Sequence, residues 1–298
     1  MIVEQELWLQ VRNSMVKGHL LPRAILGDQF LYQADNILLS RSAWVPGLGI
    51  GVKSCSVYPD NPSTYDLPTI HGSMVIFDDA NGKVRGTLDN DEVTNLKTAA
   101  DSVLGSSLLA RAGSTKLLIL GAGKVALHLV QAYAALMPHL TEVSLWNRTT
   151  HRGAAAVSAL TKSGFRVKQV SDLRSAVQDA DVISSALMTS EPVLKGTWVQ
   201  PGTHVDLIGA FNKKMREADD VLVTKARLFC DCFDTTVDHI GEFYDPLARG
   251  VIKREDVLGD LYGLVPGEIK RESSSEITLF KNGGGAHLDL MTAQVLLP

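Results

Sequence analysis

Residues 116–126, Lys-Leu-Leu-Ile-Leu-Gly-Ala-Gly-Lys-Val-Ala, decide the fold of this chain. The run Leu117–Leu120 is continuously apolar, which is typical of a strand buried on both faces of a sheet. Residues 121–126 fit the pattern G-x-G-x-x-G/A, and an apolar helical pattern follows as far as about Met137. A strand, a glycine turn and a helix in this order predict the phosphate-binding corner of a nucleotide-binding unit.

The small residues of this turn each meet a physical requirement of phosphate binding. Gly121 permits the tight turn, Gly123 lets a pyrophosphate approach the backbone, and Ala126 lets the helix and strand pack closely. The helix N-terminus offers unpaired N–H groups and the positive end of its dipole. We therefore expect the whole turn to bind the cofactor through Gly121, Ala122, Gly123, Lys124, Val125 and Ala126. A glycine-rich joint that binds nothing is the alternative.

The end of the next predicted strand, 142–146, selects between two cofactors. A site that prefers NAD usually has an acidic residue there for the ribose 2′-hydroxyl, but this chain has Asn147. Arg148 can make charge-assisted hydrogen bonds to a 2′-phosphate, and Thr149 adds a hydroxyl. We expect NADPH as the cofactor, with NADH possible. An ordinary polar loop and helix cap is the alternative interpretation of this segment.

Strand-like and helix-like segments alternate on both sides of this corner. Predicted strands lie at 142–146, 166–170, 181–185, 204–208, 220–223 and 276–280, and predicted helices at 125–137, 151–163 and 172–179. Alternation at this spacing indicates an α/β fold with a doubly wound parallel sheet. The first third differs, with a helix near 1–20, strands at 36–44, 49–57, 72–77 and 84–88, and a helix at 91–112. We expect a strand-rich α+β domain of residues 1–112 with 283–298, and a dinucleotide-binding domain of residues 113–282.

Composition places the chain among ordinary globular proteins. Its 298 residues are 45% hydrophobic and 21% charged, which argues against a disordered or fibrous chain. With 29 basic and 33 acidic residues the net charge is −4, so nothing indicates a nucleic-acid or membrane partner. No apolar run reaches the roughly 18 residues of a membrane span, and the start is not a secretory signal. We expect a cytoplasmic protein.

Metal chemistry is not expected either. Cys230 and Cys232 form a C-x-C pair without a second pair, and the only other cysteine is Cys55. His239 and Glu242 have the spacing of two helix ligands but lack a third, so we expect them on a solvated helix face.

A series of motifs in a fixed order then carries a family resemblance. They are Pro46-Gly-Leu-Gly-Ile-Gly-Val-Lys53, Leu67-Pro-Thr-Ile-His-Gly72, Thr98-Ala-Ala100, the glycine turn and Glu276-Ile-Thr-Leu-Phe-Lys-Asn282. From about Leu38 to Leu290 the chain resembles the ornithine cyclodeaminase/mu-crystallin family. The resemblance implies a substrate and dimerisation domain, a Rossmann domain and a C-terminal helix that returns to the first domain. The family includes cyclodeaminases, alanine dehydrogenases, reductases of cyclic imino acids and crystallins that bind small ligands.

The family's substrates carry a carboxylate beside an amine or imine, so they need fixed cations. Lys53 matches the family's active-site lysine, although a lysine that reaches solvent from an edge strand is the alternative. Lys97 stands where many members have an arginine, which keeps the charge and loses the bidentate fork. Arg41 is a further candidate for the carboxylate, and His71 a candidate proton donor. A hydrogen-bonded structural role is the alternative for His71.

Two features favour a reductase among these members. Phe211 stands at about the position where the cyclodeaminases have an aspartate, and a phenyl ring cannot exchange protons. The segment around the glycines 283–285 looks most like the 1-pyrroline-2-carboxylate reductases, and Gly284 is expected to lie close to substrate or cofactor. A flexible connector is the alternative for these glycines.

The expected function is therefore NAD(P)H-dependent reduction of a cyclic imino acid by a homodimer. The substrate would be 1-pyrroline-2-carboxylate, and its six-membered homologue 1-piperideine-2-carboxylate, giving L-proline or L-pipecolate. An ornithine cyclodeaminase, an alanine dehydrogenase and a non-catalytic, crystallin-like NADPH-binding protein are the alternatives.

Overall fold

The structure, a computed structural model, describes residues 3–297 and divides them into two compact units. Unit 1 holds the described residues up to Leu9 together with Thr98–Gly284. Unit 2 holds Gln10–Lys97 together with the described residues from Gly285 onward. Helices α1 (Gln5–His19) and α3 (Asn90–Leu109) each contribute residues to both units.

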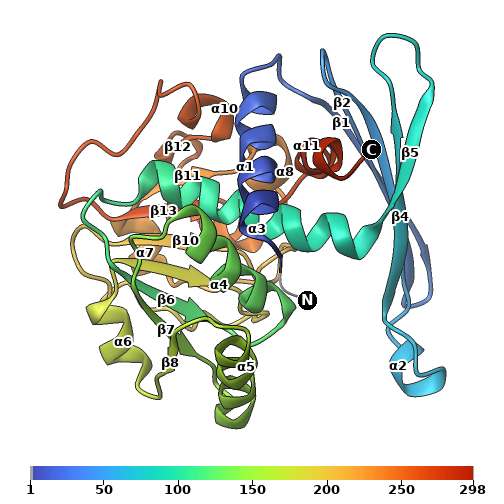
Figure 1. The fold of residues 1–298 in the computed structure, drawn as a ribbon. Coiled ribbons are helices and arrows are strands. Elements are labelled where there is room, and N and C mark those ends of the chain that lie inside the picture. Colours follow the sequence, from blue (N-terminus) through green and yellow to red (C-terminus); the bar gives the residue numbers. More distant parts are fainter. Residues whose placement is uncertain (1–2, 298) are drawn as a thin grey trace. The chain divides into compact units, whose positions relative to one another are not determined.

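Unit 1 is built on one eight-stranded sheet in which every paired strand is parallel (Figure 1). The strand order is β12-β11-β13-β10-β9-β6-β7-β8. The strands are β6 (Lys116–Leu120), β7 (Glu142–Trp146), β8 (Val167–Gln169), β9 (Val182–Ser185), β10 (His204–Leu207), β11 (Arg227–Cys230), β12 (Val257–Gly259) and β13 (Thr278–Lys281). The predicted doubly wound α/β fold is confirmed.

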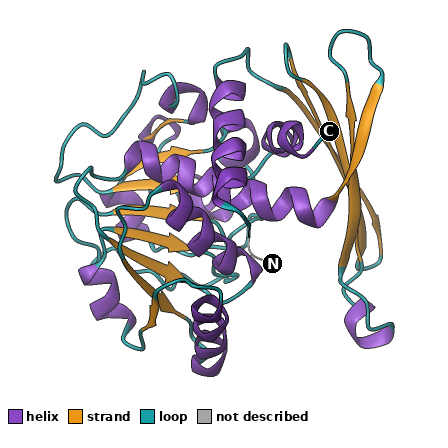
Figure 2. Ribbon diagram, viewed as in Figure 1, coloured by secondary structure: helices purple, strands orange, loops and turns teal. Residues whose placement is uncertain are grey.

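Helices flank this sheet (Figure 2). They are α4 (Lys124–Leu136), α5 (Thr150–Lys162), α6 (Leu173–Asp179), α7 (Asp220–Lys225), α8 (Phe233–Thr236), α9 (Gly241–Ala248), the 3-10 helix η1 (Arg254–Asp256) and α10 (Leu261–Leu264). The inner strands β6, β9, β10 and β13 are almost wholly buried, because helices and connections cover them. The continuous apolar run that predicted β6 is therefore a fully covered strand.

The prediction of a strand at 220–223 is wrong, because a cap makes this segment the helix α7. The Asp219 side chain accepts the N–H of Leu222 and so satisfies a free donor at the helix start. The strand of this region is β11, which begins at Arg227. Neither β11 nor β12 was predicted, since each has only three or four residues.

Unit 1 takes more of the chain than expected, because the second half of α3 packs on its sheet. Gly105 lies so close to the ring of Phe280 that a side chain at this position would collide with it. Asn282, just after β13, donates from Nδ2 to the carbonyl of Thr98 (3.0 Å). These contacts join residues from Thr98 onward to unit 1 and move the boundary from the expected residue 112 to residue 97.

Unit 2 is built on a five-stranded antiparallel sheet with the strands in sequence order. The strands are β1 (Ile25–Gln33), β2 (Asn36–Val45), β3 (Gly49–Val57), β4 (Ile70–Phe77) and β5 (Val84–Asp89), with the short helix α2 (Asn61–Thr64) between β3 and β4. The C-terminal helix α11 (Ala286–Leu296) lies against β2 and β3 (Figure 1). A glycine at 51 permits this approach, because an added Cβ would press on Met74 and Leu290. The strand β1 was not predicted.

The alternating burial along β3 separates the two faces of this sheet. Gly51, Lys53 and Cys55 point toward α11 and are buried, while Val52 and Ser54 on the other face are half-buried. The first face therefore holds the buried Lys53.

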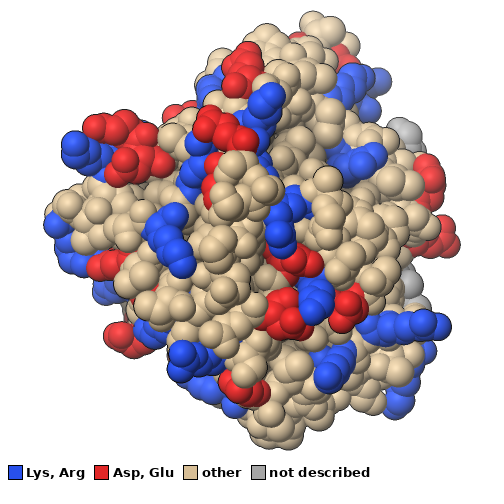
Figure 3. All heavy atoms as spheres, turned by 90° about the vertical axis from the view of Figure 1, so that its left-hand side faces the viewer, with Lys and Arg blue, Asp and Glu red and all other residues tan. Residues whose placement is uncertain are grey.

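On the side of the molecule shown in Figure 3, Lys and Arg side chains are interspersed with Asp and Glu side chains. Ion pairs such as Arg227–Glu272 and Arg254–Asp238 accompany this mixed surface. Mixed charges of this kind produce no extended field of one sign. Within residues 3–297, no helix is both long and apolar enough to cross a membrane.

Candidate active site

The glycine turn of unit 1 lies between the buried strand β6 and the helix α4, as the pattern predicts. Gly121 has a φ of +117°, a conformation that side chains disfavour, and an added Cβ would lie 3.0 Å from the carbonyl oxygen of Ala186. Gly123 is the N-cap of α4 and is exposed, with no atom within 4 Å of an added Cβ. Ala126 is fully buried beneath the turn.

This geometry fits the phosphates of a dinucleotide. The open space over Gly123 leads to the first N–H groups of α4, which has no side-chain cap. Ala122 and Val125 are half-buried, and Lys124 is exposed at the first position of the helix. The six residues of the turn therefore stand together at the carboxyl end of β6.

The residues after β7 lie in one short loop before α5. Asn147 donates from Nδ2 to the carbonyl of Thr149 (2.9 Å), and Thr149 is the N-cap of α5. The Arg148 guanidinium is exposed and makes no hydrogen bond or ion pair within the described part of the chain. Among the described residues, the Arg148 side chain therefore remains available at the position where the sequence predicts the 2′-phosphate of NADPH.

In unit 2, the side chain of Lys53 forms an ion pair with an acid on α11. Its Nζ lies 2.7 Å from Oδ2 of Asp289 on α11, and both side chains are more than nine-tenths buried. The same Nζ donates to Oγ1 of Thr94 (3.3 Å), which in turn donates to Asn90 (3.3 Å). The alternative for Lys53, a side chain that reaches solvent from an edge strand, is therefore not observed.

Further cations surround this ion pair. Burial raises the pKa of Asp289, but the charges of Lys53, Lys97 and Arg41 outweigh burial and bring it below its ordinary value. Lys97 is itself buried. Arg41 stands opposite Lys53 in the register of β2 and β3 and also pairs with Asp28 (2.9 Å).

A buried histidine, His287, lies two residues before Asp289 on α11. Burial lowers the pKa of His287 well below its ordinary value, and the nearby charges of His19 and Lys97 add to the shift. A neutral imidazole therefore lies near the cationic side chains of Lys97 and Arg41, which also act on Asp289. Fixed cations of this kind attract an anionic substrate group such as a carboxylate.

The structure turns one expected site residue away from Lys53 and assigns another to unit 1. His71 is exposed and pairs with Ser56 in the register of β3 and β4, on the opposite face from Lys53, which pairs with Met74. Gly284 belongs to unit 1, where its N–H and that of Gly283 bind Oδ2 of Asp231. The run of glycines is therefore an ordered segment and not a flexible connector.

Unit 1 also contains buried acids that sequence reasoning missed. Asp206, Glu217 and Glu242 are fully buried near the buried Lys281. Burial raises the pKa of Glu217; Lys281 opposes this shift and Glu242 adds to it. The expectation that Glu242 lies on a solvated helix face is wrong, because its carboxylate accepts the N–H groups of Glu217 and Ala218 in the interior. Its spacing from His239 gave no sign of this.

Comparisons with known proteins agree with this architecture. The family model "Ornithine cyclodeaminase/mu-crystallin family" matches residues 47–297. A Delta(1)-pyrroline-2-carboxylate reductase from Paracoccus denitrificans is 50% identical over 97% of this chain and 92% of its own length.

Two solved structures resemble nearly the whole chain. A Thermococcus litoralis Delta(1)-pyrroline-2-carboxylate reductase in complex with NADH and L-proline has a TM-score of 0.86 and 25% identity, covering 99% of this chain and 92% of its own. An archaeal alanine dehydrogenase dimer with bound NAD has a TM-score of 0.88 and 25% identity, covering 99% and 91%. The family match spans far more than half of the residues, and the curated relative spans nearly all of them. The chain belongs to the ornithine cyclodeaminase/mu-crystallin family.

Proposed function

We propose that this protein reduces the C=N bond of 1-pyrroline-2-carboxylate, and of its six-membered homologue, to L-proline or L-pipecolate with NADPH. The observation that carries the proposal is the buried Lys53–Asp289 pair (2.7 Å) among the charges of Lys97 and Arg41. That the chain is an oxidoreductase acting on C=N follows from its relatives, one of which is the Paracoccus denitrificans reductase. The complex of the Thermococcus litoralis enzyme with NADH and L-proline supports the choice of a five-membered substrate.

The chain's own residues hold the substrate and fix its charges. Lys53 and Lys97 bind the substrate carboxylate, since both are buried cations whose field acts at low dielectric. Asp289 fixes the position of the Lys53 ammonium group, and Thr94 restrains it from a second direction. Arg41 adds to the field while its fork remains engaged with Asp28.

A reduced nicotinamide dinucleotide, when bound, supplies the hydride that forms the new C–H bond at the imine carbon. The glycine turn 121–126 holds its phosphates, and Asn147, Arg148 and Thr149 contact the ribose next to the adenine. The amine nitrogen takes one proton in the same overall reaction, so that one imine, one hydride and one proton give one amine.

The cyclodeaminase alternative is disfavoured by the loop after β10. Phe211 is 60% exposed in this loop and has no ionisable group that would handle an ammonium ion or a water. The crystallin-like alternative, a protein that binds NADPH without turnover, is disfavoured by the buried Lys53–Asp289 pair. A buried charge pair costs stability to maintain, which a site without chemistry does not require.

One assay separates these functions. Wild-type protein is expected to oxidise NADPH in the presence of 1-pyrroline-2-carboxylate, with proline as product. Lys53→Ala should retain NADPH binding and lose at least about 100-fold in kcat/KM, because a buried carboxylate contact disappears. Lys83→Ala, on an exposed turn, is the matched control and should retain full activity.

Three results would contradict the proposal. Ammonia released from ornithine without net cofactor oxidation would identify a cyclodeaminase. NADPH binding without turnover of any cyclic imine would identify a binding protein. Full activity of Lys53→Ala would remove this lysine from the mechanism.

We also propose that two copies associate through the second face of the unit 2 sheet. Ile25, Leu31, Leu38 and Trp44 are exposed there, and the register of β1 and β2 places them on the face opposite Lys53. The related alanine dehydrogenase is described as a dimer. The cytoplasmic location expected from the sequence remains a prediction.

A further inference from the structure

The fully buried carboxylate of Glu217 joins the two loops that follow strands β9 and β10. Its Oε1 accepts the hydroxyl of Ser185 (2.5 Å) and the N–H of Leu187 (2.8 Å), both at the end of β9. Its Oε2 accepts the N–H of Ala210, just beyond β10 (3.1 Å). Each oxygen therefore serves a different loop, and one side chain fixes the spacing between them.

The loop after β9 packs against the backbone of the glycine turn, and the loop after β10 packs against the backbone of the loop after β9. Ala186 donates its N–H to the carbonyl of Leu120 (2.8 Å), and its own carbonyl lies beside Gly121. Gly209 presses against the backbone of Leu187 and leaves no room for a side chain. The carboxylate thus controls the arrangement of three neighbouring loops at the carboxyl edge of the sheet.

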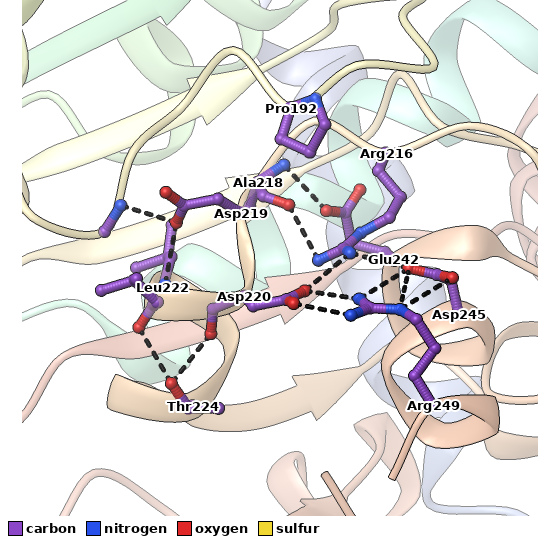
Figure 4. Close-up of polar contacts among 12 residues, drawn as sticks. Pro192, Arg216, Ala218, Asp219, Asp220, Leu222, Thr224, Glu242, Asp245 and Arg249 are labelled. Atoms are coloured by element: carbon purple, nitrogen blue, oxygen red, sulfur yellow. Dashed lines mark hydrogen bonds and ion pairs between the residues drawn. The ribbon is translucent and has the colours of Figure 1, made fainter. Parts of the chain in front are cut away.

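A second buried carboxylate holds the backbone of Glu217 in place. Glu242 accepts the N–H of Glu217 (3.0 Å) and that of Ala218 (2.9 Å), and Figure 4 shows the latter contact. The preceding residue, Arg216, donates to Asp220 (2.7 Å) in a network that includes Arg249 and Asp245 (Figure 4). The segment is therefore anchored on both sides of Glu217.

The charges around Glu217 are costly to bury. Lys281, at the end of β13, is the buried cation that acts on both glutamates, and it donates to the carbonyls of Leu207 and Asn282 (2.8 Å each). Two acids and one base remain away from solvent. The donors that the carboxylate accepts offset this cost, because an apolar side chain in its place would leave them unsatisfied.

The place of these loops in the fold indicates what they meet. The strand order reverses between β6 and β9, and dinucleotides bind across the carboxyl ends of strands at such a point. The β6–β7 side provides the glycine turn and Arg148 for the phosphates and the adenosine half. The loops after β9 and β10 lie on the other side, which receives the nicotinamide half.

We propose that Glu217 is a positioning residue for the nicotinamide half of the dinucleotide, acting through the loops after β9 and β10. The inference rests on the proposed function, because it takes a nicotinamide dinucleotide as the ligand. Glu217 acts through backbone that it fixes and touches neither substrate nor cofactor.

The test compares whole dinucleotides with fragments that lack nicotinamide. Glu217→Gln keeps the shape but replaces one acceptor oxygen with an NH₂ group, so one loop loses its partner. Dissociation constants are measured for NADPH and NADH, and for ADP-ribose and its 2′-phosphate, together with kcat. We expect Kd for the dinucleotides to rise and kcat to fall by at least about tenfold, with Kd for the fragments changed less than about twofold. Glu255→Gln, at a glutamate on the surface, is the matched control and should resemble wild type.

The outcomes separate this inference from the function on which it rests. Wild-type protein that binds neither NADPH nor NADH would overturn the proposed function and this inference together. Wild-type binding with unchanged Kd and kcat in Glu217→Gln would overturn the inference alone. Equal weakening of dinucleotides and fragments, with a lower unfolding temperature, would show a merely structural carboxylate and overturn it as well.

A milder variant covers the case in which Glu217→Gln does not fold. Ser185→Ala removes one donor to Oε1 and leaves both backbone N–H bonds in place. Its Kd for the dinucleotides should rise by about two- to fivefold, and its Kd for the fragments should change less. The absence of this difference in a folded Ser185→Ala protein that binds NADPH would then contradict the proposal.

Discussion

We predict that Arg148, a single exposed side chain, selects between NADPH and NADH. It makes no ion pair within the described residues, so its removal costs the fold nothing that the structure shows. Arg148→Ala is expected to raise KM for NADPH about tenfold or more and to leave KM for NADH within about twofold, because only NADPH has a 2′-phosphate for the guanidinium. Steady-state kinetics with both cofactors measure the ratio.

The control for this prediction is Arg152→Ala, an exposed arginine in the first turn of α5. It should leave both KM values unchanged. Equal KM values of wild-type enzyme for NADPH and NADH would contradict the assignment of NADPH. An unchanged ratio in Arg148→Ala would remove Arg148 from cofactor selection.

At the same scale, the sequence predicts some site residues and misses their partners. The motif predicts Lys53 as a site residue, and the structure buries its side chain. Asp289 follows it by more than 200 positions, and only the packing of α11 on β3 brings the two together. His71 also follows from a motif, but the period of two along β4 turns it to the other face. Motifs give the type of residue, and the sheet register decides where it points.

Strand β10 carries two buried groups whose pKa values move in opposite directions. Burial lowers the pKa of His204 to about 3 and raises that of Asp206 to about 7. His204 therefore stabilises the fold more as pH rises from about 3 to 6.5, because the unfolded state binds the extra proton there. Asp206 has the opposite effect between about pH 4 and 7, because the folded state binds the extra proton. These two opposite effects of pH on the free energy of unfolding partly cancel in the wild-type protein.

Removal of the Asp206 carboxylate should reveal the pH dependence of stability that His204 produces. Asp206→Asn is expected to make the free energy of unfolding increase more steeply with pH than in wild type, by up to about 1.4 kcal/mol per pH unit between pH 5 and 7. Urea unfolding at several pH values measures the difference. Asp179→Asn, with an exposed carboxylate, should leave the wild-type slope unchanged. Parallel pH curves for wild type and Asp206→Asn would contradict the raised pKa.

The elements that the sequence failed to predict share a physical cause. The run 220–223 has the composition of a strand, yet the Asp219 cap and a helical start overrule it. The strands β11 and β12 are too short to show a period. Long elements such as α3 and β3 were predicted correctly, since their pattern repeats several times. Buried acids such as Glu217 could not be predicted from the sequence, because a polar residue is by default assigned to the protein surface.

At the scale of the whole molecule, the two units contain different parts of the proposed machinery. Unit 1 has the dinucleotide turn and the loops held by Glu217, and unit 2 has the cations around Lys53. In unit 2, α11 covers one face of the sheet, and Ile25, Leu31, Leu38 and Trp44 are exposed on the other face. Exposed apolar side chains that form a large patch on a monomer mark sites of association. The proposed dimer interface is therefore tested on this second face.

Charges on this face should prevent the two copies from associating. Leu31 and Leu38 are partners in the register of β1 and β2, so Leu31→Glu with Leu38→Glu places two carboxylates at one spot on the face. In a twofold dimer each carboxylate would be buried against an identical surface, which is strongly unfavourable. Light scattering after size exclusion should give twice the 32.2 kDa chain mass for wild type and the single mass for the double variant. Tyr65→Glu, exposed next to α2, should remain dimeric. A monomeric wild type, or a dimeric double variant, would place the interface elsewhere or nowhere.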